Sequence, residues 1–140
     1  MSDVSGNPAS NDAAELILAS IPLCGLLGIR AASASPERVE LQLEWRRELC
    51  TSNEILHGGA LMALADTAGA VCAFLNLPAG AGGTATIESK TNFLAAVRRG
   101  TVTASSRPLH AGSRTVVVET EVRTDEGRLA AKVTQTQAVL

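Results

Sequence analysis

The clearest pattern in the chain is a strict alternation of polar and apolar residues over positions 38–46. The odd-numbered positions from Val39 to Trp45 are apolar, and the even-numbered positions carry charged or amide side chains. Successive side chains of a strand point to opposite faces, so this pattern predicts a half-buried antiparallel strand.

Further stretches with strand-like composition are Leu26–Ala32, Thr84–Leu94, Thr101–Ser106, Arg114–Thr124 and Arg128–Val139. Asp125-Glu126-Gly127 predicts a hairpin turn before the last of them. Asn11 or Asp12 is expected to cap a short helix through Ala19, and Pro22 ends it.

The longest apolar stretch predicts one slim helix from about Gly58 to about Asn76. It contains six alanines and three glycines between Gly58 and Ala73, and its one ionised side chain is Asp66. Because Asp66 and the glycines interrupt it, this stretch is expected to fall short of a membrane span.

One long central helix between strands is not the repeating strand–helix pattern of a parallel sheet. The order favours an α+β fold in which an antiparallel sheet wraps around the helix. The 140 residues correspond to one domain, expected over residues 12–140. Residues 1–11, rich in Ser, Asn, Asp, Gly and Pro, are expected to be a flexible tail.

Composition excludes several classes of function. A net charge of -2 and 2% aromatic residues argue against a nucleic acid or a membrane surface as partner. Cys24, Cys50 and Cys72 form no CxxC pair and are expected to be reduced core residues. His57 and His110 are too far apart for metal-ligand spacing, so no metal is expected. With no signal peptide at the amino terminus, a cytoplasmic location is expected.

The helix carries the candidate chemistry. The carboxylate of Asp66 loses hydration in apolar surroundings and must be paired, hydrogen-bonded or used. His57, Gly58 and Gly59 expose backbone N–H groups at the helix start, where negative charge is stabilised. Together these are the parts of an acyl-transfer site, although a structural acid paired with Lys or Arg is the alternative for Asp66.

Leu56-His57-Gly58-Gly59-Ala60 followed by Leu64-Ala65-Asp66-Thr67 resembles the signature of hotdog-fold acyl-CoA thioesterases. The branch it is most similar to is the phenylacetate-pathway (PaaI-like) type, related to one class of 4-hydroxybenzoyl-CoA thioesterase. The resemblance covers roughly Leu23 to Leu140. It implies a hotdog fold, hydrolysis of an aromatic or medium-chain acyl-CoA without a further cofactor, and a homodimer or a dimer of dimers (a homotetramer).

The resemblance also implies catalytic roles. Asp66 would attack the thioester carbonyl or act as general base on water, and the sequence leaves both open. The Gly58 N–H would be the oxyanion donor. Gly59 would assist it or only permit close packing. His57 would hydrogen-bond near the thioester or act as a structural cap.

Two further candidates depend on the resemblance alone. Relatives place an Asn or Gln about six residues before the histidine, where this chain has Thr51; Asn53 is the candidate to position water, or an ordinary turn residue. Thr86 falls where some relatives carry a Ser or Thr that helps to hold water, but a threonine is also ordinary in a strand.

Cations are expected near the phosphates of CoA. The candidates are Lys90, Arg98, Arg99, Arg107 and Arg114, although a solvated surface residue is the better explanation for any one of them. Gly59, Lys90 and Arg114 are the residues predicted to bind substrate.

Helix geometry predicts a site shared by two chains. Nine residues separate His57 from Asp66, which is about 13.5 Å along a helix and about 180° around it. One thioester carbon cannot contact both groups of the same chain. A non-catalytic acyl-CoA-binding protein and a hotdog dehydratase remain the alternative functions; the presence of Asp66 argues against the first, and its spacing from the glycines argues against the second.

Overall fold

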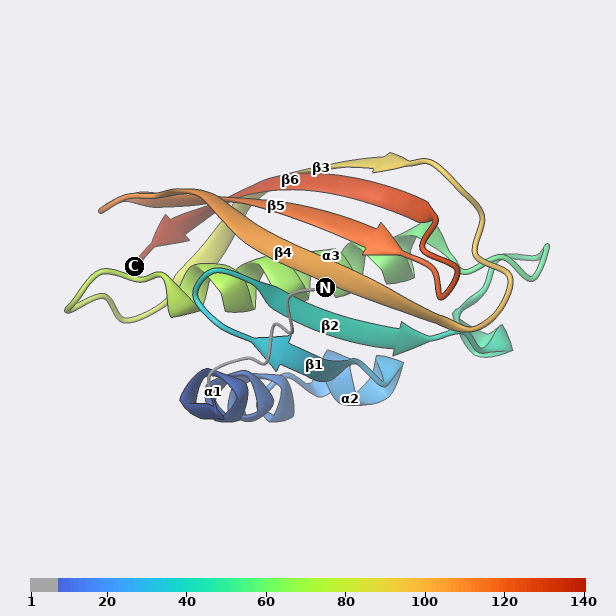
Figure 1. Cartoon of the computed structure of the whole chain (residues 1–140), viewed down its shortest axis with the longest axis horizontal. Coiled ribbons are helices and arrows are strands. Elements are labelled where there is room, and N and C mark those ends of the chain that lie inside the picture. Colours follow the sequence, from blue (N-terminus) through green and yellow to red (C-terminus); the bar gives the residue numbers. More distant parts are fainter. Residues whose placement is uncertain (1–7) are drawn as a thin grey trace.

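The computed structural model describes residues 8–140, which form a curved antiparallel sheet around one long helix (Figure 1). The strands are β1 (Arg30–Ala34), β2 (Val39–Glu44), β3 (Thr84–Phe93), β4 (Thr101–Ala111), β5 (Thr115–Arg123) and β6 (Leu129–Val139). The helices are α1 (Pro8–Ala19), α2 (Pro22–Leu27), α3 (Gly58–Leu75) and a short 3-10 helix at Arg47–Leu49. The sheet order is β1-β2-β4-β5-β6-β3. This arrangement confirms the predicted α+β fold class.

Alternation along the strands builds the core. In β2 the apolar residues Val39, Leu41 and Leu43 are buried, which confirms the predicted half-buried strand. They face α3, whose Leu64 and Ala68 are fully buried. Small residues on the helix allow the sheet to approach it closely. Because the sheet packs against α3 on one side, the rotation of the helix about its axis is fixed.

By length and composition, α3 is long and apolar enough to cross a membrane, with 18 residues and a mean hydropathy of 1.6. As expected, Asp66 and the glycines lie within this helix and interrupt its apolar sequence. The five strands β2 to β6 all pack against this helix, and its Leu64, Ala65 and Ala68 are fully buried. The core helix of a sheet-wrapped domain meets the same criteria.

The predicted first strand, Leu26–Ala32, begins too early. The chain forms helix α2 up to Leu27, and Gly28 ends it with a left-handed φ of 78°. Pro22 at the start of the helix and glycine at its end are the residues that favour this short helix. The strand itself begins only at Arg30.

The amino-terminal prediction also needs correction. Helix α1 begins at Pro8, so residues 8–11 are not a tail, and residues 1–7 lie outside the described part of the chain. Asn11 lies inside the helix instead of capping it. Its Oδ1 accepts a hydrogen bond from the Ala34 N–H at 2.6 Å, which fixes α1 against β1.

Two smaller expectations differ from the structure. Strand β4 extends beyond Ser106 to Ala111, so His110 lies in a strand and not in a loop, although it is exposed as expected.

Cys24 and Cys72 are buried free thiols, and burial raises the pKa of Cys72 to about 12. Cys50 is only half-buried and so is not a core residue.

Candidate active site

His57 caps the start of α3. Its Nδ1 accepts a hydrogen bond from the Gly59 N–H at 2.7 Å, and its backbone oxygen accepts from Ala60 and Leu61. Because Nδ1 is an acceptor here, the neutral ring carries its proton on Nε2. Of the two roles predicted for His57, the structure shows the cap.

This cap separates the roles of the two glycines. The Gly59 N–H is occupied by His57, whereas the Gly58 N–H has no acceptor within residues 8–140. A Cβ on Gly59 would lie 2.9 Å from His57 Nδ1, so a larger residue there would displace the capping ring. Gly58 therefore supplies the available donor at the positive end of the helix dipole.

The end of β3 closes over the helix start. A Cβ on Gly58 would lie 2.9 Å from Cζ of the Phe93 ring, so the two residues are in close contact. Beside them lies a hollow of about 480 Å³, mostly apolar, which Thr51, Gly58, Leu61, Phe93 and Leu94 help to line. An apolar group placed there lies next to the Gly58 donor.

Asp66 lies in the middle of α3 and is held by uncharged donors. Thr86 Oγ1 donates to Asp66 Oδ1 at 2.7 Å, and Gln135 Nε2 donates to the same oxygen at 3.2 Å. Gln137 Nε2 donates in turn to Thr86 Oγ1 at 2.7 Å. Within the described chain no Lys or Arg pairs with Asp66, so the ion-paired structural acid is not what the structure shows.

A β-bulge places Thr86 at this position. Thr86 lies opposite Gln137 and Glu88 lies opposite Thr136, so Ile87 is an extra residue in β3. Bulges turn a side chain away from the regular alternation of a strand. The structure thus brings Thr86 to Asp66, and the role of Thr86 in holding water stays a prediction.

Sequence reasoning missed Gln135 and Gln137. Both are fully buried, on the same face of β6 as Val133. The alternation of apolar and polar residues in β6 was the available signal, because it puts two amides among core residues. A buried amide needs hydrogen-bond partners, and the carboxylate of Asp66 on α3 is one such partner.

The other predicted residues lie elsewhere. Asn53 is in an exposed turn and does not line the hollow beside Gly58, whereas Thr51 does. Lys90 Nζ donates to Asn92 Oδ1 at 2.7 Å on the exposed strand β3. Arg114 lies in the turn between β4 and β5, and its carbonyl oxygen accepts from Val139. One chain does not bring these residues together with Asp66.

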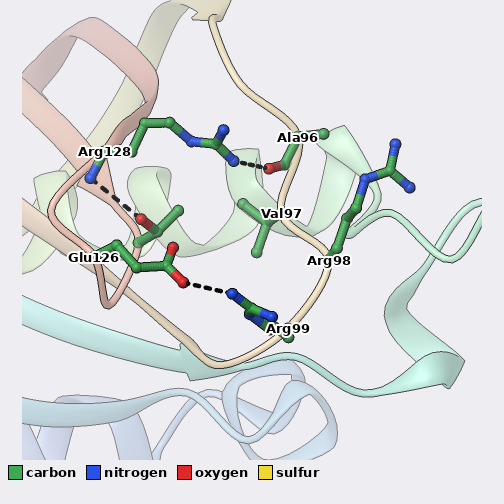
Figure 2. A pocket seen from close by; sticks show the side chains of 7 residues that line it. Ala96, Val97, Arg98, Arg99, Glu126 and Arg128 are labelled. Carbon is green, nitrogen blue, oxygen red and sulfur yellow. Dashed lines mark hydrogen bonds and ion pairs between the residues drawn. The ribbon is translucent and has the colours of Figure 1, made fainter.

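A larger hollow, about 590 Å³, lies between the β3–β4 loop and the β5–β6 hairpin (Figure 2). Arg99 pairs with Glu126 at 3.2 Å, and Arg128 donates to the backbone oxygen of Ala96 at 2.8 Å. Arg98 extends away from both and has no polar partner among residues 8–140. This hollow shares Ala96 with the hollow beside Gly58, and its only acid is already paired. Among the described residues it therefore offers no unpaired acid for acid–base chemistry.

Comparison with known proteins gives a consistent result. Residues 53–131 match the thioesterase superfamily. The chain is 30% identical to the 1,4-dihydroxy-2-naphthoyl-CoA hydrolase of Escherichia coli, over 84% of this chain and 86% of that protein. It is similar to the crystal structure of a thioesterase from Haemophilus influenzae, with a TM-score of 0.82 and 28% identity over 89% of this chain and 86% of that one. The PaaI protein of E. coli, from a phenylacetic acid degradation operon, has a TM-score of 0.85 at 20% identity, with 94% and 93% covered, and shows the same fold.

Proposed function

The chain belongs to the thioesterase superfamily and has the hotdog fold, and from this membership we propose that it hydrolyses an acyl-CoA thioester to a free acid and CoA. The observation that supports the proposal most directly is that, within residues 8–140, one helix carries both a carboxylate without a cationic partner and a free backbone N–H. Asp66 is a half-buried carboxylate without a cationic partner in residues 8–140, and Gly58 presents an unoccupied N–H. Acyl transfer needs such an acid and such a donor.

The Gly58 N–H would stabilise the negative charge that develops on the thioester oxygen. Asp66 would either attack the carbonyl carbon, forming an anhydride as the CoA thiolate leaves, or take the proton of an attacking water. In the first case one water then hydrolyses the anhydride, which releases the free acid and restores the carboxylate. Both routes need an ionised, accessible Asp66 oxygen.

The two groups of one chain are too far apart to act on one carbonyl. Eight residues of helix separate Gly58 from Asp66, which corresponds to about 12 Å along the axis. We therefore propose that the working unit is a homodimer in which Gly58 of one chain and Asp66 of the other form each site.

Strand β3 suggests how the chains meet. It is an edge strand, and exposed edges favour pairing with another chain. Asp66 contacts Thr86 near one end of β3, and Gly58 contacts Phe93 at the other. Antiparallel pairing of two β3 strands about a midpoint near Ser89 would put the Thr86 end of one chain beside the Phe93 end of its partner.

An uncovered stripe on α3 supports the same pairing. Met62, Asp66, Ala70 and Phe74 recur every four residues and so share one side of the helix. Met62 and Phe74 are 40% and 42% exposed, and Ile87 on the neighbouring strand is 60% exposed. A second copy would cover these apolar side chains and enclose Asp66.

A panel of acyl-CoA esters tests the reaction and its substrate class. We expect free thiol to be released from aromatic or medium-chain acyl-CoA, because the hollow beside Gly58 is apolar and roomy. The relative from E. coli is named for an aromatic acyl-CoA, which supports the aromatic members of the panel. Thiol release is followed with a chromogenic reagent, with Asp66→Asn protein as the blank. No release from any ester by the pure wild-type protein would refute the proposal.

The hollow in Figure 2 is proposed to receive the phosphates of CoA. Replacing Arg98 and Arg99 together by Ala should raise KM for the best acyl-CoA about tenfold, because a charge-assisted hydrogen bond of ~1.5 kcal/mol is lost. KM for the same acyl group on pantetheine, which lacks the nucleotide, should not change. Arg107→Ala is the matched control, since Arg107 pairs with Glu119 outside the hollow. Equal effects on both thioesters would contradict this placement.

A further inference from the structure

The hydrogen bonds around Asp66 have a fixed direction. A carboxylate only accepts, so the Thr86 hydroxyl must donate its single proton to Asp66 Oδ1. Thr86 Oγ1 can then only accept from Gln137, which must present its Nε2. Gln135 must likewise present Nε2 to Asp66, because its oxygen would be repelled there. The acid thus determines the orientation of every polar group in the cluster.

This orientation leaves two buried acceptors unpaired. Within residues 8–140, Oε1 of Gln135 and Oε1 of Gln137 have no hydrogen-bond donor, although both residues are fully buried. An unpaired buried carbonyl destabilises a folded protein, and such groups are uncommon. Core amides selected only for stability would be replaced by apolar residues or paired at both ends. The free-energy cost of these two unpaired oxygens is consistent with a functional role for the Nε2 donors of the same two amides.

The two donors converge on one oxygen. Thr86 and Gln135 both donate to Asp66 Oδ1, and no group in residues 8–140 donates to Oδ2. Gln135 Nε2 also lies 3.5 Å from the Asp66 backbone oxygen. The carboxylate is therefore anchored through Oδ1, and its Oδ2 carries no hydrogen bond from residues 8–140.

Gly69 makes room for this anchor. It lies one turn after Asp66 on α3, and a Cβ there would overlap the Gln135 amide. A side chain at position 69 would thus displace the Nε2 donor from Asp66. Glycine inside a helix is unfavourable by itself, and here it leaves the space on α3 that the Gln135 side chain of β6 occupies.

We propose that Gln135 and Gln137 are positioning residues for the thioesterase reaction. Gln135 holds Asp66 Oδ1 directly, and Gln137 holds it through Thr86, so that Oδ2 is the atom that attacks the thioester or takes the proton of water. This inference rests on the proposed catalytic role of Asp66. It adds two residues of β6 and the identity of the reacting oxygen.

A double-mutant cycle between Gln137 and Thr86 tests the relay. Gln137→Met keeps the length of the side chain but removes the donor, and Thr86→Val removes the hydroxyl at nearly constant shape. We expect Gln137→Met to lower kcat about tenfold with KM within twofold, and to have no further effect in the Thr86→Val background, because its action passes through Thr86. Thr86→Ser, which keeps the hydroxyl, should restore most of the kcat lost in Thr86→Val and should again be sensitive to Gln137→Met.

Gln135→Met should lower kcat about tenfold in both Thr86 backgrounds, since Gln135 contacts Asp66 independently. Thr120→Val is the matched control for lost buried polarity. It removes the buried 2.6 Å hydrogen bond between Ser106 and Thr120, and kcat should stay at the wild-type level even if Tm falls.

Each result separates this inference from the proposed function. If Asp66→Asn is inactive but both glutamine variants retain the wild-type kcat, only the positioning role fails. If Gln137→Met lowers kcat equally in the wild-type and the Thr86→Val proteins, the relay through Thr86 is overturned and Gln137 has a structural role. If Gln137→Met does not fold, the comparison of Thr86→Ser with Thr86→Val on the exposed strand still decides whether the hydroxyl orients Asp66. An active Asp66→Asn protein would refute the proposed catalytic role itself.

Discussion

Asp66→Asn is expected to lower kcat by about 10²–10⁴, the range for loss of an acid–base group, while the protein remains folded. The structure makes this substitution unusually conservative. The side-chain oxygen of Asn can still accept from Thr86 and Gln135, and the amide nitrogen replaces only the unpaired Oδ2. The change therefore removes the reacting atom and keeps the anchor. Steady-state kinetics with the best acyl-CoA and a thermal melt measure the two expectations.

Asp12→Asn is a suitable control, because Asp12 is an exposed carboxylate on α1. It should have wild-type kcat and Tm. A kcat for Asp66→Asn within about tenfold of wild type would contradict the catalytic assignment. A protein that melts far below wild type or fails to fold would instead support a structural role for the acid.

Local patterns predicted most of the fold. Period-two alternation identified β2, and the apolar stretch with small residues identified α3, because both signals come from neighbouring positions in the sequence. Leu26–Ala32 was assigned to a strand because its apolar composition suits either structure. There the decisive signals were Pro22 and Gly28, which delimit a helix of six residues.

The site was predicted less completely, since its contacts are non-local. Asp66 and Gly58 belong to one sequence motif, and so they were identified together. Gln135 meets Asp66 because β6 packs against α3, and Gln137 meets Thr86 because β6 pairs with β3, and no local pattern fixes either contact. The distinction between Gly58 and Gly59 depends on the orientation of the His57 ring, which occupies one amide and leaves the other available.

The removal of a single N–H at Gly58 should have a comparably large effect. Gly58→Pro keeps the helix start, because proline suits the first helical position and His57 already has φ -60° and ψ 135°, which suit a residue before proline. Loss of one oxyanion donor is expected to lower kcat by about 10²–10³. Gly58→Ala is the matched control, since its Cβ meets Phe93 as proline would, but its N–H remains.

Mixing the two inactive proteins tests whether sites are shared. After subunit exchange, a mixed dimer of Asp66→Asn and Gly58→Pro chains has one site with both defects and one with neither. Activity should rise to about a quarter of wild type in an equal mixture, because half of the dimers are mixed and each has one intact site. Sites confined to one chain would give no recovery in any mixture. Full activity of a monomer in sedimentation at assay concentration would also refute sharing, since Gly58 and Asp66 of one helix would then suffice.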